Sequence, residues 1–535
     1  MTERLQIKNG RVYDPANGVD GALKTLCIDN GKIVAGFEEG VTARVIDASG
    51  MVIMPGGVDM HCHIAGPAIN RARRLLPEDE GKLVPSTTVT GCRYSGLGYT
   101  TAIEAAIAPS GAKQAHWELG DTPNLDSAFL LLLANNDMIL EALAEQEKEL
   151  ARDLIGLLLA RTGAYGIKAV NPGCVRWWKH GGDPLAVNSI DDPLGSTSVT
   201  SRSILDSLAD AAEHFKLPHA VHVHCNRLGV PGNVKITLET LRALAGRRHH
   251  LTHLQFHAYA DDGKGGFASG ATALMDEINR QTETTVDVGQ VMFGPALTIT
   301  EDAALEHVLW QMTGQRWVNV DFELEAGCGM LPFEFKPKVL FHSMQWAIGM
   351  EIFLLAKDPW RVALSTDHPN GASFLAYPRI IAALMDRDFR AEEMKRANAD
   401  AIARTVLKDL TREYNLSEIA IISRAGPARI LGLRQKGHLG LGADADVTIY
   451  NDQPDRLQMF QMPRFVLKAG QIVAEEGHTR TQLIGQRHLV TPPVDSRAER
   501  HFQTWMRQYG SYRPEQLRVP QVEALPITTT QTDGK

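Results

Sequence analysis

Two patterns of hydrophobic and polar positions alternate along most of this chain. Short apolar runs, typical of buried strands, are followed by longer segments with one apolar face, for example residues 137–161, which predict a helix. This alternation indicates βα units built around a parallel sheet. The first predicted strand ends at His61, and seven more are expected at residues 100–106, 128–133, 166–170, 220–224, 251–256, 285–288 and 361–366.

Eight βα units predict an α/β protein of the TIM-type (β/α)8 barrel class, spanning residues 55–425. Shorter alternating runs occupy both ends of the chain, and Asn-Gly turn signals accompany those at the N-terminal end. We therefore expect a small β-sandwich domain that both termini build, from residues 1–54 and 426–490. A tail with several prolines, residues 491–535, ends in a threonine-rich run and is predicted to be extended or disordered.

The composition is that of an ordinary globular enzyme. Of 535 residues, 44% are hydrophobic and 22% are charged, and the formal net charge is -8 without a basic tract, which argues against nucleic acid as a partner. Six scattered cysteines form no C-x-x-C pair, which favours a reducing compartment and argues against an iron–sulfur cluster. The first residues do not resemble a signal peptide, and no apolar run approaches the ~20 residues needed to cross a bilayer. We expect a cytoplasmic protein without a membrane partner, and the lack of a redox-cofactor motif disfavours dehydrogenation by this chain alone.

A pair of histidines, His61 and His63, carries the first chemical signal. Residues i and i+2 of a strand point to the same face, so both imidazoles can reach one metal ion. Taken alone, such a pair is more often two histidines that pack in a core or face solvent. Further residues of metal-site type lie at the ends of other predicted strands, namely Lys168, His224, His253 and Asp367. Because all these ends meet at one rim of a barrel, the set predicts a metal centre whose imidazole and carboxylate ligands suit zinc.

Lys168 is the least ordinary member of the set, because burying an ammonium group is costly. A buried lysine has a lowered pKa, and its neutral amine can add carbon dioxide to become a carbamate, an anion whose two oxygens can bridge two metal ions. Two cations that share one water lower the pKa of that water toward ~7, and Asp367 beside it would shuttle the proton. Three alternatives stay open: His222 competes with His224, His257 with His253, and, from a loop, Lys179 with Lys168.

The pattern of residues at the strand ends resembles the amidohydrolase superfamily in its binuclear, carboxylated-lysine branch, and residues 437–446 look like that superfamily's return into its β-sandwich. Five segments look more closely like the A-type subunits of formylmethanofuran dehydrogenase, namely residues 55–66, 166–173, 222–229, 253–257 and 287–294. Over nearly the whole chain the sequence resembles the A-type subunits of formylmethanofuran dehydrogenase, and within that family the A-type subunits of bacterial formyltransferase/hydrolase complexes. The resemblance implies that one divalent metal is bound by His61, His63 and Asp367, the other by His224 and His253, and that Lys168 bridges them as a carbamate.

The resemblance also implies a function. The expected reaction is hydrolysis of an N-formyl bond on a methanofuran-type (methylofuran) carrier, releasing formate in formaldehyde oxidation, with other subunits of a hetero-oligomeric complex as partners. Three other functions remain open for the same residues. The site could run the reverse condensation in a formylmethanofuran dehydrogenase, it could serve a cyclic amidase like hydantoinase or dihydroorotase, or the chain could be a non-catalytic scaffold that kept the fold.

Other polar residues near the predicted strand ends are candidates for contact with substrate. His116 and Asn135 lie close to two of these ends, although ordinary loop roles account for them equally well. Arg71, Arg73 and Arg74 follow the first strand and could meet an anionic carrier tail, or form a solvated basic face.

Overall fold

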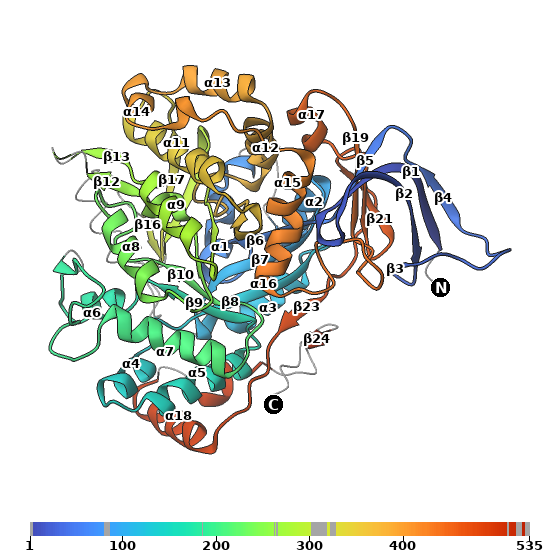
Figure 1. Cartoon of the computed structure of the whole chain (residues 1–535). Helices are drawn as coiled ribbons and strands as arrows, with labels where there is room; N and C mark the ends of the chain where they lie inside the picture. The colour runs from blue at the N-terminus through green and yellow to red at the C-terminus, as the bar shows by residue number, and fades with distance from the viewer. Residues whose placement is uncertain are drawn as a thin grey trace.

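Eight parallel strands form a nearly closed barrel that carries the larger part of the chain (Figure 1). The computed structural model describes residues 4–79, 86–183, 186–261, 263, 266–300, 318–320, 328–510, 513–519 and 527–529. In order around the barrel, the strands are β6 (Gly57–Cys62), β7 (Tyr99–Ile107), β8 (Asp126–Leu132), β9 (Gly166–Val170), β10 (Val221–His224), β11 (His249–Leu251), β14 (Thr284–Asp287) and β18 (Val362–Ala363). A bridge between Cys62 and His368 brings the first strand against the segment that follows the last one. The predicted TIM-type barrel is confirmed.

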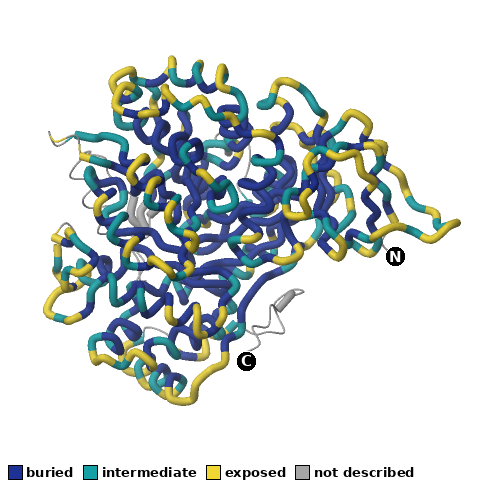
Figure 2. Tube along the Cα trace, in the orientation of Figure 1, coloured by how far each residue is buried: buried dark blue, intermediate teal, exposed yellow. Residues whose placement is uncertain are grey.

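Helices cover the outside of the barrel (Figures 1 and 2). The main ones are α2 (Thr87–Gly96), α3 (Ala112–Gly120), α7 (Ser201–His214), α8 (Val234–Ala243), α9 (Ala271–Arg280), α11 (Leu340–Leu355), α12 (Tyr377–Met385) and α16 (Gly426–Leu431). Within the described ranges, no helix is both long enough and apolar enough to span a membrane. Buried residues gather in the barrel strands, because a parallel sheet covered on both faces needs near-continuous burial.

The helix predicted over residues 137–161 is in fact two helices, α4 (Asp137–Ala144) and α5 (Lys148–Thr162). The break falls at Gln146, whose φ of 63° lies in the left-handed region. The backbone N–H of Gln146 donates to the Leu143 carbonyl at 3.0 Å, which ends α4. Both helices bury their apolar faces in the same core, so the helical spacing of apolar residues continues across the break. The spacing alone therefore predicts one helix where there are two.

Two predicted strands end earlier than expected, and both early ends position side chains of the predicted site. β11 stops at Leu251, and a 3-10 turn (Leu254–His257) replaces the rest of the predicted strand after His253 adopts left-handed backbone with φ of 33°. β18 has only two residues, and Asp367 lies in the turn that follows with φ of 52°. Because His253 and Asp367 lie in turns after their strands, their side chains no longer alternate between the two faces of the sheet. Both side chains lie at the rim of the barrel instead.

Both ends of the chain share a second, nine-stranded sheet, at the right of Figure 1. Its order is β22-β21-β20-β19-β5-β1-β2-β3, with β4 paired to β1. These strands are β1 (Leu5–Asp14), β2 (Val19–Asp29), β3 (Lys32–Val34), β4 (Arg44–Asp47), β5 (Met51–Pro55), β19 (Val447–Asn451), β20 (Phe465–Lys468), β21 (Gln471–Glu475) and β22 (His478–Thr479). The sheet has a core of its own, so the small β domain exists as expected. The boundaries after residues 54, 425 and 490 stay a prediction.

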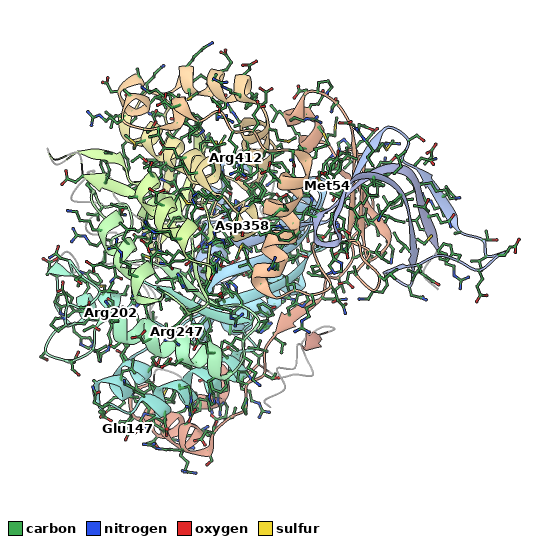
Figure 3. All side chains as sticks on the ribbon, in the orientation of Figure 1. Met54, Glu147, Arg202, Arg247, Asp358 and Arg412 are labelled. Carbon is green, nitrogen blue, oxygen red and sulfur yellow. The ribbon has the colours of Figure 1, made fainter. Side chains whose placement is uncertain are left out.

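β5 belongs to two cores at once. Val52 and Met54 pack in the barrel core, whereas Ile53 between them packs in the core of the β domain. Figure 3 labels Met54 at this junction. Successive residues of a strand point to opposite faces, so a strand between two cores must be apolar at every position. This explains the uninterrupted apolar run at residues 51–54.

The tail contains a helix that the sequence analysis did not predict, α18 (Ser496–Tyr509). Its buried residues repeat every four positions and are Ala498, Phe502 and Met506. This face packs on α5, while β23 (Arg487–Leu489), just before it, runs beside β8. The prediction of an extended tail is therefore wrong for residues 496–509. Much of the tail's last part, residues 520–526 and 530–535, lies outside the described residues.

A buried cluster of charges joins the barrel to the β domain. Lys468 Nζ lies 2.6 Å from Asp126 Oδ2, at the start of β8, and 2.7 Å from Asp446 Oδ2, just before β19. Lys436 completes the cluster, 2.9 Å from Asp446 Oδ2 and in contact with Asp126. Burial alone would raise the pKa of Asp126, but the two lysines hold it well below its usual value. Removing one member would leave its partners buried without their counter-charge.

Replacing Asp126 by Asn should lower the free energy of unfolding by about 3–5 kcal/mol, because two buried lysines lose a counter-charge. The exposed Asp20→Asn is the control and should change it by less than about 0.5 kcal/mol. Since the pKa of Asp126 is lowered by folding, its contribution is complete above the unfolded value of about 3.9 and is lost as the pH falls below it. Chemical denaturation should therefore give the same difference between variant and wild type from about pH 5 to about pH 8. A difference that vanishes within this range would contradict the assignment.

Candidate metal centre

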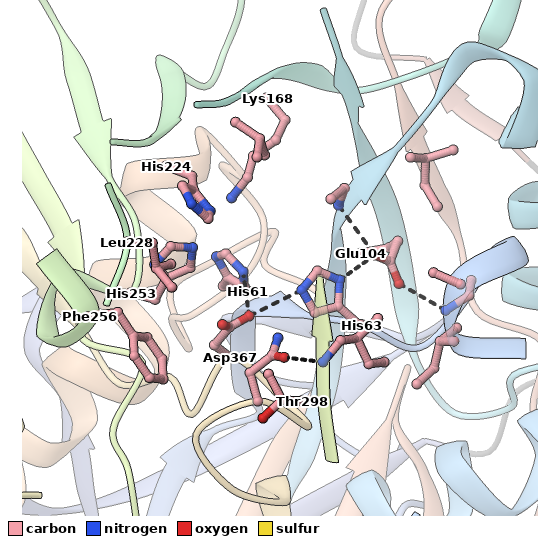
Figure 4. Close-up of a pocket in the computed structure, with 18 residues that line it drawn as sticks. His61, His63, Glu104, Lys168, His224, Leu228, His253, Phe256, Thr298 and Asp367 are labelled. Carbon is pink, nitrogen blue, oxygen red and sulfur yellow. Dashed lines mark hydrogen bonds and ion pairs between the residues drawn. The ribbon is translucent and has the colours of Figure 1, made fainter. Parts of the chain in front are cut away.

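All six predicted ligands line one pocket at the C-terminal rim of the barrel (Figure 4). They are His61, His63, Lys168, His224, His253 and Asp367. The strand ends that carry them are far apart in the sequence and meet because the barrel closes. The fold thus brings the predicted set together, and metal binding by these residues stays a prediction.

His61, His63 and Asp367 form a first group of possible metal ligands. Asp367 Oδ1 lies 2.9 Å from His61 Nε2 and 3.1 Å from His63 Nε2, and one ligand atom of each residue lies within 4.8 Å of the others. The turn after β18 aims the carboxylate, because the Asp367 backbone N–H donates to Ser365 Oγ at 2.8 Å. Two imidazoles and a carboxylate are a donor set that fits a divalent metal such as zinc.

Glu104, on β7, supports this group and was missed by the sequence analysis. One carboxylate oxygen lies 3.0 Å from His63 Nδ1, and the other accepts the backbone N–H groups of Ile64 (2.6 Å) and Ala65 (2.9 Å). Burial disfavours a charge on His63, yet its bonds to Asp367 and Glu104 raise the pKa of its imidazole to about 10. The surroundings of His63 therefore favour positive charge, as a cation site requires. An acidic residue inside an otherwise apolar strand was the signal that could have revealed Glu104.

His224, His253 and His257 form a second group, with one ligand atom of each within 4.8 Å of the others. Among the described residues, none hydrogen-bonds the buried His224 Nε2, His253 Nδ1 or either ring nitrogen of His257. Ring nitrogens are costly to bury unpaired, and a divalent cation would satisfy them. Burial lowers the pKa of His257 to about 3, so this ring is neutral, which is the form that binds metal. The second group therefore also fits a divalent cation.

The pocket lining distinguishes the histidines that compete for one role. His224 and His253 line the pocket, whereas His222 and His257 do not, although His257 could reach the same cation as His224 and His253. His222 Nε2 lies 2.9 Å from His61 Nδ1, so this ring is engaged beneath the first group. The lining of the pocket thus favours His224 and His253 as the residues that face a ligand.

Lys168 belongs to a polar layer inside the barrel. It is in register with His222 on β10, and His222 is in register with His250 on β11, so the three side chains share the interior face. Lys168 is 2% exposed, and its amine end points toward His224 in Figure 4. The competing Lys179 is exposed and does not line the pocket.

The two candidate substrate contacts do not line the pocket. His116, on α3, bonds the Thr162 carbonyl through Nε2 at 2.8 Å, so its predicted role is corrected: it ties α3 to the end of α5. Asn135 donates to the Val170 carbonyl at 2.7 Å and braces the end of β9. Its place next to β9 explains why it looked like a site residue in the sequence.

The arginines after the first strand do not act as one basic face. Arg73 is buried and donates through Nη2 to the Ile64 carbonyl at 2.5 Å. Arg71 and Arg74 are exposed. A shared contact of all three with an anionic tail is therefore contradicted by the inward turn of Arg73.

Apolar side chains form the remaining walls of the pocket, which holds about 880 Å³ including its open mouth. They include Phe256 and Ile299, the latter on β15 (Gly294–Thr300), part of a small inserted sheet. The Ile299 N–H donates to Asn370 Oδ1 at 2.6 Å, which fastens this sheet to the turn that carries Asp367. Apolar walls above a polar floor suit a substrate whose reacting group is polar and whose body is apolar or aromatic.

The barrel, its rim and the ligand set define the class of protein. Residues 44–474 match the model of the Amidohydrolase family, and the chain belongs to this family. The protein FwdA of Methanocaldococcus jannaschii is 40% identical over 512 residues, which cover 90% of this chain and 89% of that protein. The A-type subunit of the formyltransferase/hydrolase complex Fhc of Methylorubrum extorquens is 39% identical over 547 residues, 98% of each chain. The resemblance seen in the sequence is confirmed.

Comparison with solved structures gives the same relationship. One chain in the crystal structure of FhcABCD from Methylorubrum extorquens in complex with methylofuran has a TM-score of 0.93 and 37% identity, and covers 99% of this chain and 100% of that one. A D-aminoacylase, at 14% identity and a TM-score of 0.53, shares the fold.

Replacing Glu104 by Gln should weaken the binding of a divalent metal by about 10–100-fold, because His63 loses the carboxylate that orients its ring. Adding Zn²⁺ to metal-stripped protein against a competing chelator measures the affinity. Glu351→Gln is the matched control, since Glu351 is an equally buried carboxylate on α11 and does not line the pocket. The Zn²⁺ affinity of this variant should equal that of the wild type. Equal affinities for Glu104→Gln and wild type would refute a supporting role for Glu104.

Proposed function

We propose that this protein hydrolyses an N-formyl bond on a methanofuran-type carrier such as methylofuran, releasing formate and the carrier's free amine. One observation carries the proposal: six ligand-type residues meet in one pocket of a chain that matches the A-type Fhc subunit over 98% of both lengths. The similar chain of FhcABCD was solved in a complex with methylofuran. The reaction belongs to one-carbon metabolism, in the oxidation of formaldehyde.

The proposed site would hold two divalent cations, and zinc would suit its donors best. His61, His63 and Asp367 would hold one cation, His224 and His253 would hold the other, and Lys168, as a carbamate, would supply anionic oxygens. Bound there, the cations would polarise the formyl oxygen and lower the pKa of water. A buried ammonium beside two cations would be strongly disfavoured, which supports carboxylation of Lys168.

The chain's own residues position the substrate and move the proton. As the water oxygen attacks the formyl carbon, Asp367 accepts the proton of the water and delivers it to the amine nitrogen when the C–N bond breaks. The products are formate and the free amine. Phe256 and Ile299 in the apolar walls would hold the furan end of the carrier and keep bulk water away.

Partner subunits complete the proposed function. FhcABCD is a complex of several subunits, and the chain matches one of its chains over 99% of its length. We infer that this protein likewise works in a hetero-oligomer. The reverse condensation of formate with the carrier would use the same residues by microscopic reversibility. A cyclic amidase is the weaker alternative, because the dihydroorotase of Elusimicrobium minutum matches only 11% of the chain.

Asp367→Asn should lower formate release from an N-formylated furan amine by about 10²-fold or more, because the amide cannot accept the proton. Metal should stay bound, since His61 and His63 keep their ring nitrogens. Formate is measured enzymatically, and bound metal by mass spectrometry. The exposed Asp20→Asn is the control with normal activity. Normal formate release from metal-loaded Asp367→Asn would rule out the proton role.

The wild-type protein should act on linear formamides and leave cyclic amides intact. Purified protein, with its partner subunits, is assayed side by side on an N-formylated furan amine, hydantoin and dihydroorotate. If hydantoin or dihydroorotate were hydrolysed faster than the N-formylated furan amine, the protein would be a cyclic amidase. Less than one zinc per chain after careful purification would favour the non-catalytic scaffold.

A further inference from the structure

His61 heads a hydrogen-bonded column of three buried imidazoles, and the proposed reaction does not use the two lower ones, His222 and His219. His61 Nδ1 lies 2.9 Å from His222 Nε2, and His222 Nδ1 lies 3.0 Å from His219 Nε2. At the far end, His219 Nδ1 lies 3.0 Å from the Ile430 carbonyl oxygen. All three rings are at most 1% exposed, so neighbouring protein groups decide where their protons lie. The column descends from the rim, because His219 precedes β10 and His224 ends it.

The Ile430 carbonyl sets the direction of every hydrogen bond in the column. A carbonyl oxygen only accepts, so His219 Nδ1 must carry a proton. Burial lowers the pKa of His219 to about 3, so the ring is neutral and its Nε2 accepts. His222 Nδ1 must then donate, which leaves His222 Nε2 as an acceptor. His61 Nδ1 is therefore the donor at the top of the column.

The opposite direction is blocked at the lower end of the column. It would place two acceptors, the ring nitrogen of His219 and the Ile430 oxygen, 3.0 Å apart without a proton between them. At the upper end, Asp287 Oδ2 lies 3.4 Å from His61 Nδ1 and also favours a proton there. With Nδ1 occupied by a proton, Nε2 is the His61 nitrogen that can bind a cation, and it lies 2.9 Å from Asp367 Oδ1 in the first group of possible ligands.

The position of the Ile430 carbonyl is built into the fold. Ile430 is the next-to-last residue of α16, so no N–H group of the helix donates to its carbonyl oxygen, which is left to accept from another group. Gly432 ends the helix with a φ of 74°, and a Cβ there would come within 2.8 Å of Pro218 Cβ. The glycine thus allows the helix end to approach the chain next to His219 closely.

We propose that His222 and His219 are positioning residues, which hold His61 in the Nδ1-protonated tautomer so that its Nε2 lone pair faces a divalent cation. The inference rests on the metal centre of the proposed function and adds two residues to it. They act through His61 and touch neither cation nor substrate.

Two substitutions at one position test the column. In His222→Gln, the amide oxygen can accept from His61 Nδ1 and the amide N–H can donate to His219, so the direction is kept. In His222→Leu, neither bond is possible. We expect His222→Leu to weaken Zn²⁺ binding by about 10–100-fold and His222→Gln to stay near wild type. His249→Leu is the control with unchanged affinity, since His249 is equally buried but bonds the Arg247 carbonyl and Thr284.

A second measurement reads the tautomer itself. The ¹⁵N shifts of the His61 ring in metal-stripped wild-type protein, assigned with His61→Asn, should report a protonated Nδ1, because the column fixes the proton on that nitrogen. An unprotonated Nδ1, or equal Zn²⁺ affinities for the Leu and Gln variants, would overturn the proposal. Should wild-type protein bind no divalent metal while the ring shows the expected tautomer, the proposed function fails and the column stands.

Discussion

The seam between the first and last barrel strands is the interaction on which both the fold and the candidate metal centre depend. β6 meets the segment after β18 through the bridge of Cys62 with His368 and the hydrogen bond from the His63 N–H to the His368 carbonyl at 2.8 Å. The same seam places Asp367 against His61 and His63. Closing the barrel and assembling the first group of possible ligands are therefore one event, and the candidate site cannot form before the fold is complete.

Below this seam the barrel interior is polar, which a core tolerates only when its members pair with one another. Asp287 Oδ2 lies 3.0 Å from His250 Nε2, and the Asp287 Oδ1 accepts the His253 N–H at 3.0 Å. Burial alone would raise the pKa of Asp287, but the neighbouring His61 and His250 hold it well below its usual value. Leaving one such group unpaired costs roughly 1–3 kcal/mol, so the network is stable only when complete. A complete network is rigid, and it holds the candidate ligands above it in fixed orientations.

Residue types at the strand ends made most of the candidate site predictable. Lys168 stood out because a lysine in an apolar strand needs a reason, and Glu104 carried the same kind of signal without being recognised. The column below His61 could not be predicted, because Ile430 is more than two hundred residues from His219 and contributes only a backbone carbonyl. Local patterns gave a wrong prediction at two places. The apolar spacing continued through the break at Gln146 and predicted one helix instead of two. The prolines of the tail predicted extended chain, although the apolar residues of α18 follow a four-residue spacing.

The sequence by itself determined the barrel class, the shared β domain and the chemical types at the rim, because strand and helix periodicity and side-chain chemistry are local properties. Only the tertiary structure decided that His224 rather than His222 faces the pocket and that Glu104 braces His63. It also decided that His116 lies outside the barrel. These outcomes depend on distances between side chains from different strands, and such distances exist only once the barrel has closed.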